Sequence, residues 1–242
     1  GNADADVGSI TTSFPYARKP GRAGSGQVAA TCYGVPPGTL PFWLAHFDRH
    51  GVAHSGLQER FGGGYVRVRH PAGLLIEVVE SPDDSRRPWT TREISADVGT
   101  RGFCAAVLSV RDACDQEAFL VDPLGLPKVG VDARFHRFEI PGARAARFID
   151  LLHDPDRAAG SWGFGAGTVH HLALDVETDD ALLQQKSIYE ELGFTDASEL
   201  KDRYYFHSMY VRSPGGILIE CTSNVPAGFY LDESFEELGT KL

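Results

Sequence analysis

Two adjacent histidines and a distant glutamate are the residues of this sequence whose types and spacing indicate metal chemistry. His170 and His171 stand at the head of a short apolar segment, and Glu220 directly follows three apolar residues of a later segment. Imidazole and carboxylate groups are costly to bury without a partner. A metal ion bound by both His171 and Glu220 would supply that partner. We therefore predict that His171 and Glu220 are metal ligands rather than core residues.

Arg203 and Tyr210 are polar residues that could act beside such a metal. Arg203 precedes the aromatic residues 204–206, and a cation at the mouth of an aromatic pocket could hold a phenolate or a developing anion. Tyr210 and Glu220 are equidistant from Gly215, so a hairpin centred there would place them opposite each other on one face. The expected apolar and aromatic lining for a flat ring is Phe206, Met209 and Tyr210.

His170 has two interpretations that the sequence leaves open. Neighbours in a regular strand point to opposite faces, so His170 and His171 can approach one site only where the strand start is bent. We assign the ligand role to His171 because Ala173 shares its face and leaves room for a substrate. His170 is then either a histidine hydrogen-bonded to backbone or a proton-transfer group.

Short strands and three helices must position these residues. The apolar run 169–176 is typical of a buried strand, and the helix after it ends at Gly193, a common residue at that place. The other expected strands are 9–16, 28–35, 61–69, 74–80, 103–110, 128–131, 135–140, 204–211 and 217–220. The expected helices are 41–50, 111–124 and 180–192.

An internal repeat separates folding signals from chemical ones. The order strand, helix, strands occurs three times, and two copies match in sequence. Glu77 aligns with Glu220 behind a Pro-x-Gly hairpin, but Ala30 stands where the later copy has His171. We therefore expect Glu77 to be paired with a nearby arginine or with solvent. In the third copy Cys104 takes the corresponding position, which we interpret as a buried thiol of the core.

Composition excludes several classes of partner. The 242-residue chain is 42% hydrophobic and 23% charged with a net charge of −10, which disfavours nucleic acid and anionic membranes. No apolar run approaches the length of a membrane span, and no signal-peptide pattern opens the chain. The four cysteines lack CxxC spacing, so we expect free thiols in or near the core of a cytoplasmic protein.

The expected organisation is two halves joined by a linker. The N-terminal half spans residues 1–85, a polar linker with prolines spans 86–98, and the C-terminal half, residues 99–242, carries the metal site. The chain opens at Gly1 without a Met and runs almost at once into a strand-like segment. We therefore expect that the given sequence lacks the start of the chain.

The repeated units resemble the vicinal oxygen chelate superfamily, which includes glyoxalase I, bleomycin-resistance proteins and type I extradiol dioxygenases. Residues 167–171, with 202–210 and Glu220, look like the hydroquinone ring-cleaving dioxygenases of that group. The resemblance is close over residues 167–232 and weaker but continuous over 6–142. It implies an α+β fold of repeated βαβββ units that form mixed, curved half-barrel sheets with flanking helices, with the first unit largely missing.

The resemblance also implies an activity and a cofactor. His171 and Glu220 would be two of three ligands to Fe(II), with Mn(II), Zn(II) or Ni(II) as alternatives, and His170, Arg203 and Tyr210 would move protons and hold substrate oxygens. The family's first histidine comes from the opening strand of the first unit, for which this sequence has no counterpart. The implied substrates are a hydroquinone-like or other dihydroxylated aromatic and O2, in aromatic degradation. A homo-oligomer is left open.

Two rival functions share the same fold. A glyoxalase-type isomerase or lyase would use a metal and a glutamate base without O2. A non-catalytic binding or resistance protein would hold an aromatic ligand without metal, but it would leave His171 and Glu220 unexplained as buried polar groups. Arg203 with Tyr210 favours the dioxygenase.

Overall fold

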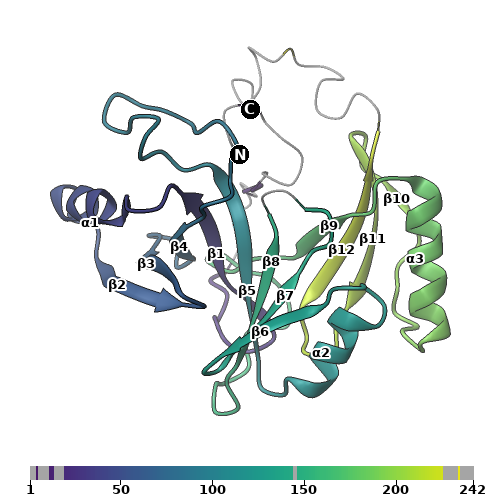
Figure 1. Ribbon diagram of the computed structural model, residues 1–242. Coiled ribbons are helices and arrows are strands. Elements are labelled where there is room, and N and C mark those ends of the chain that lie inside the picture. Colours follow the sequence, from purple (N-terminus) through teal and green to yellow (C-terminus); the bar gives the residue numbers. More distant parts are fainter. Residues whose placement is uncertain (1–3, 5–10, 14–18, 144–145, 226–233, 235–242) are drawn as a thin grey trace. The chain divides into compact units, whose positions relative to one another are not determined.

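The computed structural model describes residues 4, 11–13, 19–143, 146–225 and 234, and the chain divides into two compact units. Unit 1 comprises Gly1–His170 with Pro214–Ile217, and unit 2 comprises His171–Ser213 with Leu218–Leu242. Figure 1 labels the helices and strands of both. No helix among the described residues is long and apolar enough to cross a membrane.

Unit 1 contains a mixed eight-stranded sheet. The strand order is β2-β3-β4-β1-β5-β8-β7-β6, in which the central strands β1 and β5 are antiparallel. β1 is parallel to β4, and β5 is parallel to β8, so the sheet consists of two halves with the same topology (Figure 1). Its strands are β1 (Gln27–Val35), β2 (His54–Arg60), β3 (Gly63–Arg69), β4 (Leu75–Glu80), β5 (Gly102–Val110), β6 (Lys128–Asp132), β7 (Phe135–Glu139) and β8 (Phe148–His153).

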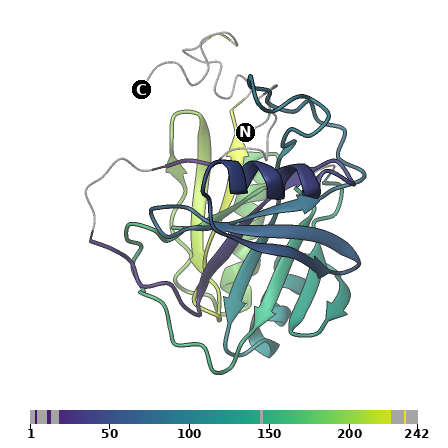
Figure 2. The same ribbon diagram turned by 90° about the vertical axis from the view of Figure 1, so that its left-hand side faces the viewer.

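Each half of the unit 1 sheet has one helix, which connects its first strand to the next strand in sequence. The first is α1 (Leu40–Arg49) and the second is α2 (Cys114–Val121). Leu40, Trp43 and Phe47 recur at helical spacing on α1 and are buried in one cluster with valines of β3 and β4. Figure 2 shows α1 crossing the strands of this half.

Unit 2 contains a four-stranded sheet and one helix. The strand order is β10-β11-β12-β9, with β9 parallel to β12, and α3 runs along β11 and β12 (Figure 1). Thr178 caps α3 by accepting a hydrogen bond from the Ala181 amide at 3.1 Å. The elements are β9 (Leu172–Asp175), α3 (Asp179–Glu191), β10 (Lys201–Asp202), β11 (Phe206–Arg212) and β12 (Leu218–Asn224).

The α+β class and the mixed, curled half-barrel sheets are confirmed, with differences at the ends of elements. The strand expected over 169–176 begins only at Leu172. Gly167, in the segment before it, lies so close to the Ala72 carbonyl that a Cβ would be 1.9 Å from its oxygen. The helix expected over 111–124 begins at Cys114, whose amide donates to the Asp112 carboxylate at 2.9 Å. Of the strand expected over 9–16, residues 11–13 are described and have no regular structure.

The strand registers confirm the repeat. Each of the three described repeats places a carboxylate on its last strand: Glu77 on β4, Asp150 on β8 and Glu220 on β12. On the neighbouring antiparallel strand, the residues paired with these three carboxylates are, in the same order, Arg67, Arg137 and Tyr210. The paired position on the parallel strand is Cys32, Val107 or Ala173.

These registers correct one prediction about the cysteines. His171 lies two residues before Ala173, so its counterparts are Ala30 and, in the second half of unit 1, Ala105 rather than Cys104. Cys104 is nevertheless a buried free thiol, as expected, and so are two of the other cysteines. Cys114 departs from the prediction because it is exposed at the first turn of α2.

The turn before the third strand of each repeat, which is β3, β7 or β11, also has the same backbone conformation at its first residue. Phe61, Ala133 and Tyr204 all have positive φ, at 52°, 49° and 72°. Each is the first residue of a two-residue hairpin loop, where such backbone angles match the twist of the strands. The residue before the turn is Arg60, Asp132 or Arg203, so this position can be compared among repeats.

Candidate metal and substrate site

Glu220 is the centre of the candidate site. It lies in the middle of β12, where Tyr210 of β11 is its partner on one side and Ala173 of β9 on the other. The pairing with Tyr210 is the one that the symmetric hairpin around Gly215 predicts. Glu220 is only 2% exposed. A carboxylate in this place needs a partner of opposite charge or a hydrogen-bond donor.

His171 provides that partner. Its Nε2 atom lies 2.8 Å from Glu220 Oε2, and its ring stands edge-on to the Tyr210 ring with 5.8 Å between centroids. His171 immediately precedes β9, so it occupies the end of the strand that is parallel to β12. The other oxygen, Glu220 Oε1, is buried and accepts no hydrogen bond among the described residues.

Electrostatics keeps Glu220 charged. Burial alone would raise the pKa of Glu220, but hydrogen bonding from His171 and from the Tyr210 hydroxyl outweighs burial, so this pKa lies below its ordinary value. Burial, and then the adjacent Glu220, raise the pKa of Tyr210. Tyr210 is therefore a protonated phenol at neutral pH, beside an ionised carboxylate.

Two cations approach Tyr210 from the β10 side. The Arg203 Nη2 atom lies 3.5 Å from the Tyr210 hydroxyl, and its guanidinium carbon lies 5.7 Å from the ring centroid. Lys201 Nζ lies 5.9 Å from the same centroid. Arg203 follows β10 and directly precedes Tyr204, the residue with positive φ at the repeated turn. The sequence indicated Arg203; Lys201 was missed because it stands among other exposed charges.

Ser208 is a second residue that the sequence interpretation missed. Side chains alternate along β11, so Ser208 shares the face of Tyr210 and of Phe206. Ser208 is buried, and its hydroxyl is one of the groups that lower the pKa of Glu220. The alternation of side chains along the strand would have identified Ser208 from the sequence. Alternation also corrects the predicted lining, because Met209 faces the other side of β11 and is fully buried there.

His170 belongs to unit 1, although it is the next residue to His171. Its ring packs edge-on against the Phe164 ring, with 4.2 Å between centroids. Neither histidine is within a regular strand, so the alternation that would send them to opposite faces does not apply to this pair.

The donor set fits a divalent transition metal. Imidazole nitrogen and carboxylate oxygen are the ligand types of the two-histidine, one-carboxylate iron sites. Glu220 Oε1, buried and lacking a hydrogen bond, is an acceptor that a cation would satisfy. In the described part of unit 2, no third His, Cys, Asp or Glu side chain gathers with these two.

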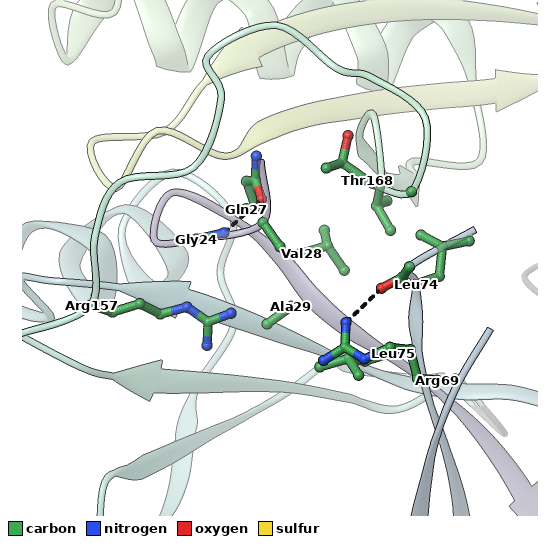
Figure 3. A pocket seen from close by; sticks show the side chains of 13 residues that line it. Gly24, Gln27, Val28, Ala29, Arg69, Leu74, Leu75, Arg157 and Thr168 are labelled. Atoms are coloured by element: carbon green, nitrogen blue, oxygen red, sulfur yellow. Dashed lines mark hydrogen bonds between the residues drawn. The ribbon is translucent and has the colours of Figure 1, made fainter. Parts of the chain in front are cut away.

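A separate small pocket occupies unit 1 and suits water rather than an aromatic ring. Figure 3 shows Arg69 and Arg157 with apolar side chains around it. Arg69 donates to the Gly73 carbonyl at 3.1 Å, and the Gly24 amide donates to Gln27 at 3.1 Å. Its volume is about 60 Å³, far below the several hundred Å³ of ordinary ligand pockets. We therefore assign it no function.

Comparison with known proteins identifies relatives over the whole chain. The chain is 35% identical over 246 residues to the chlorohydroquinone/hydroquinone 1,2-dioxygenase of Sphingobium indicum, with 100% of this chain and 76% of the relative covered. It is also 35% identical over 243 residues to the candidate ring-cleaving dioxygenase MhqO of Bacillus subtilis, with the same coverage. No family model matches the chain.

A solved structure gives the same result. The crystal structure of a candidate dioxygenase from Bacillus subtilis matches with a TM-score of 0.91 and 35% identity, covering 100% of this chain and 76% of the other. Identity and coverage at this level, together with the repeated βαβββ units, identify the fold as that of the vicinal oxygen chelate superfamily. The chain belongs to the family of ring-cleaving dioxygenases.

Proposed function

We propose that this chain is an iron(II)-dependent ring-cleaving dioxygenase of the extradiol type that acts on hydroquinone-like aromatics. His171 and Glu220 are two of the metal ligands in this proposal. The observation that carries it is the buried Glu220, whose Oε1 atom has no hydrogen bond among the described residues while His171 approaches the other oxygen at 2.8 Å. The two relatives at 35% identity support ring cleavage as the reaction class.

The protein's own groups would bind and orient the substrate. A bound ferrous ion would pass electron density to O2 and lower the pKa of a substrate hydroxyl. The Tyr210 hydroxyl, beside Glu220, can donate a hydrogen bond or a proton to a ring oxygen. Arg203, at 3.5 Å from that hydroxyl, places positive charge where a phenolate would develop. His170 is the second candidate for proton transfer, because it adjoins the ligand His171.

Oxygen uptake tests the proposal most simply. Chain reconstituted with Fe(II) under anaerobic conditions is mixed with hydroquinone or chlorohydroquinone, and O2 consumption is followed together with loss of the aromatic absorbance. We expect one O2 consumed for each ring opened, with both oxygen atoms found in the product by ¹⁸O2 labelling. Oxygen consumption without ring opening would contradict the proposal, since simple autoxidation of a hydroquinone gives a quinone.

Matched variants connect the activity to the proposed residues. His171→Ala should abolish iron-dependent uptake, because it removes a ligand. His207→Gln is the control: His207 is a histidine of the same unit that pairs with Asp179 at 2.9 Å, and its variant should retain activity. Equal activity in both variants would refute the assigned site. Turnover of a thiol conjugate without O2 would favour the isomerase or lyase, and ligand binding without metal would favour a binding protein.

A further inference from the structure

Three potential metal ligands gather on unit 1 in a cluster that the proposed oxygenase chemistry does not use. His46, His50 and Glu93 each offer one ligand atom, and these atoms all lie within 4.8 Å of one another. Within the described ranges of the chain, no other set of three His, Cys, Asp or Glu side chains gathers in this way. We call His46, His50 and Glu93 the α1 triad.

The helix sets the spacing of the two histidines. His46 lies in the last turn of α1 and His50 is its C-cap residue, so the two are four residues apart and share one face. Their ring centroids are 4.6 Å apart. This end of a helix carries partial negative charge from its free carbonyls, which favours a bound cation.

Aromatic packing holds the His46 ring in place. The ring stacks on Phe42 with centroids 5.6 Å apart and an interplanar angle of 16°, and Trp43 stands edge-on to it at 5.8 Å. Its Nδ1 atom is buried without a hydrogen-bond partner among the described residues. The imidazole is therefore restrained without using its full hydrogen-bonding capacity.

The loop that carries Glu93 is fixed to the helix. The Thr91 hydroxyl accepts hydrogen bonds from the amides of Glu93 and Ile94, at 3.3 and 3.1 Å. Ile94 packs against the α1 core cluster, and Trp43 Nε1 donates to the Val98 carbonyl at 3.0 Å. Glu93 Oε2 consequently lies 2.8 Å from His50 Nε2. Little further ordering is needed to close the triad around an ion.

We propose that the α1 triad binds a divalent transition-metal ion of the zinc type and thereby fastens the 91–98 loop to α1. Two imidazoles and one carboxylate, with water in the remaining position, form a zinc ligand set. His50 and Glu93 are 45% and 51% exposed, so an ion can enter from solvent. Because His171 and Glu220 take no part, this site does not depend on the oxygenase proposal.

Zinc titration of the metal-free chain tests the proposal. After removal of metals with a chelator, ZnCl₂ is added and the heat of binding is measured for the unaltered chain and for His46→Gln, His50→Gln and Glu93→Gln. We expect a zinc-binding step, separate from any at His171 and Glu220, that each of the three variants weakens by about 10- to 100-fold or more. As a second readout, zinc should slow tryptic cleavage after the exposed Arg92 in the unaltered chain, and not in His46→Gln.

Two controls give the experiment its specificity. His54 pairs with Asp48 at 3.1 Å on the same side of the unit but has no second imidazole, so His54→Gln should leave the zinc step unchanged. His171→Ala should also leave it unchanged, which separates this site from the one proposed for iron. An unaltered affinity in His46→Gln, or an equal loss in His54→Gln, would overturn the proposal.

Discussion

Glu77 in unit 1 and Glu220 in unit 2 occupy the same position of the repeat but have different partners. Glu77 is fully buried and pairs with Arg60 at 2.7 Å, and Arg67 Nε donates to its other oxygen at 3.0 Å. Glu220 is nearly as buried, but its neighbours are His171 and Tyr210. Ala30 stands where His171 does.

Arg60 explains how the carboxylate positions of unit 1 obtain a partner without a metal. Its guanidinium also contacts Asp150 at 2.9 Å, and it lies between the rings of Tyr65 and Phe135 at 4.7 and 4.8 Å. Arg60 is therefore shared by the carboxylates of both halves of the sheet, and Arg67 and Arg137 each pair with one of them as well. The equivalent residue in unit 2, Arg203, is exposed and contacts Tyr210 instead. The comparison shows that one carboxylate position is satisfied by a side-chain cation in unit 1, whereas in unit 2 it keeps an unbonded oxygen that a metal could satisfy.

Removal of Arg60 should have the largest effect on stability. Arg60→Ala leaves Glu77 and Asp150 buried together without their shared cation, and we expect a loss of about 3–5 kcal/mol in the free energy of unfolding. Denaturant unfolding followed by the fluorescence of the buried Trp43 would measure it. Arg134→Ala, which breaks an exposed pair with Asp154, is the matched control and should cost no more than about 1 kcal/mol. Equal costs would mean that the cluster is not a buried charge centre.

Loss of the Tyr210 hydroxyl should affect activity rather than folding. Tyr210→Phe keeps the ring against His171 but removes the group next to Glu220, and we expect kcat for ring cleavage to fall about 100-fold. The control is Tyr204→Phe, because Tyr204 is 60% exposed. Steady-state oxygen uptake would measure kcat for both variants. An unchanged kcat in Tyr210→Phe would mean that the Tyr210 hydroxyl takes no part in the mechanism.

Acid should weaken unit 1 through Glu77. Burial would raise the pKa of Glu77, but the bonds from Arg60 and the charge of Arg67 lower it below its ordinary value of 4.5. The folded state thus binds fewer protons than the unfolded state, so this stabilisation is complete above pH 4.5 and is lost as the pH falls through the lower folded pKa. Urea midpoints measured downward from pH 5 should decrease, with a smaller slope in Glu77→Gln. A slope that Glu77→Gln leaves intact would assign the acid sensitivity to other groups.

The smallest effect should come from Arg203. Its guanidinium is exposed, so solvent and salt screen its charge. We expect Arg203→Ala to raise KM for a hydroquinone by about 5-fold, with a smaller ratio at high salt because an exposed ion pair contributes up to about 1 kcal/mol. Michaelis curves at two ionic strengths would measure this ratio. A ratio that does not change with salt would indicate that Arg203 acts through shape rather than charge.

The symmetry of the Gly215 hairpin and the internal repeat allowed the main contacts of Glu220 and Glu77 to be predicted from the sequence. The hairpin around Gly215 places Tyr210 opposite Glu220, as its symmetry requires, and Glu77 pairs with arginine as expected for a copy that lacks His171. The sequence could not predict that Arg60 would reach Asp150, because that contact joins residues far apart in sequence. The late start of β9, at Leu172, was also missed, since the apolar run by itself does not show where strand pairing begins.

Iron content is the most direct test of the difference between the two carboxylate sites. The chain, reconstituted with Fe(II) and freed of excess metal, would be compared with His171→Ala and Arg60→Ala by elemental analysis. His171→Ala should hold one iron per chain fewer than the unaltered protein, while Arg60→Ala, if folded by circular dichroism, should not lose that iron. Iron retained in full by His171→Ala would contradict the account, because the partner of Glu220 would then not be a metal that His171 helps to bind.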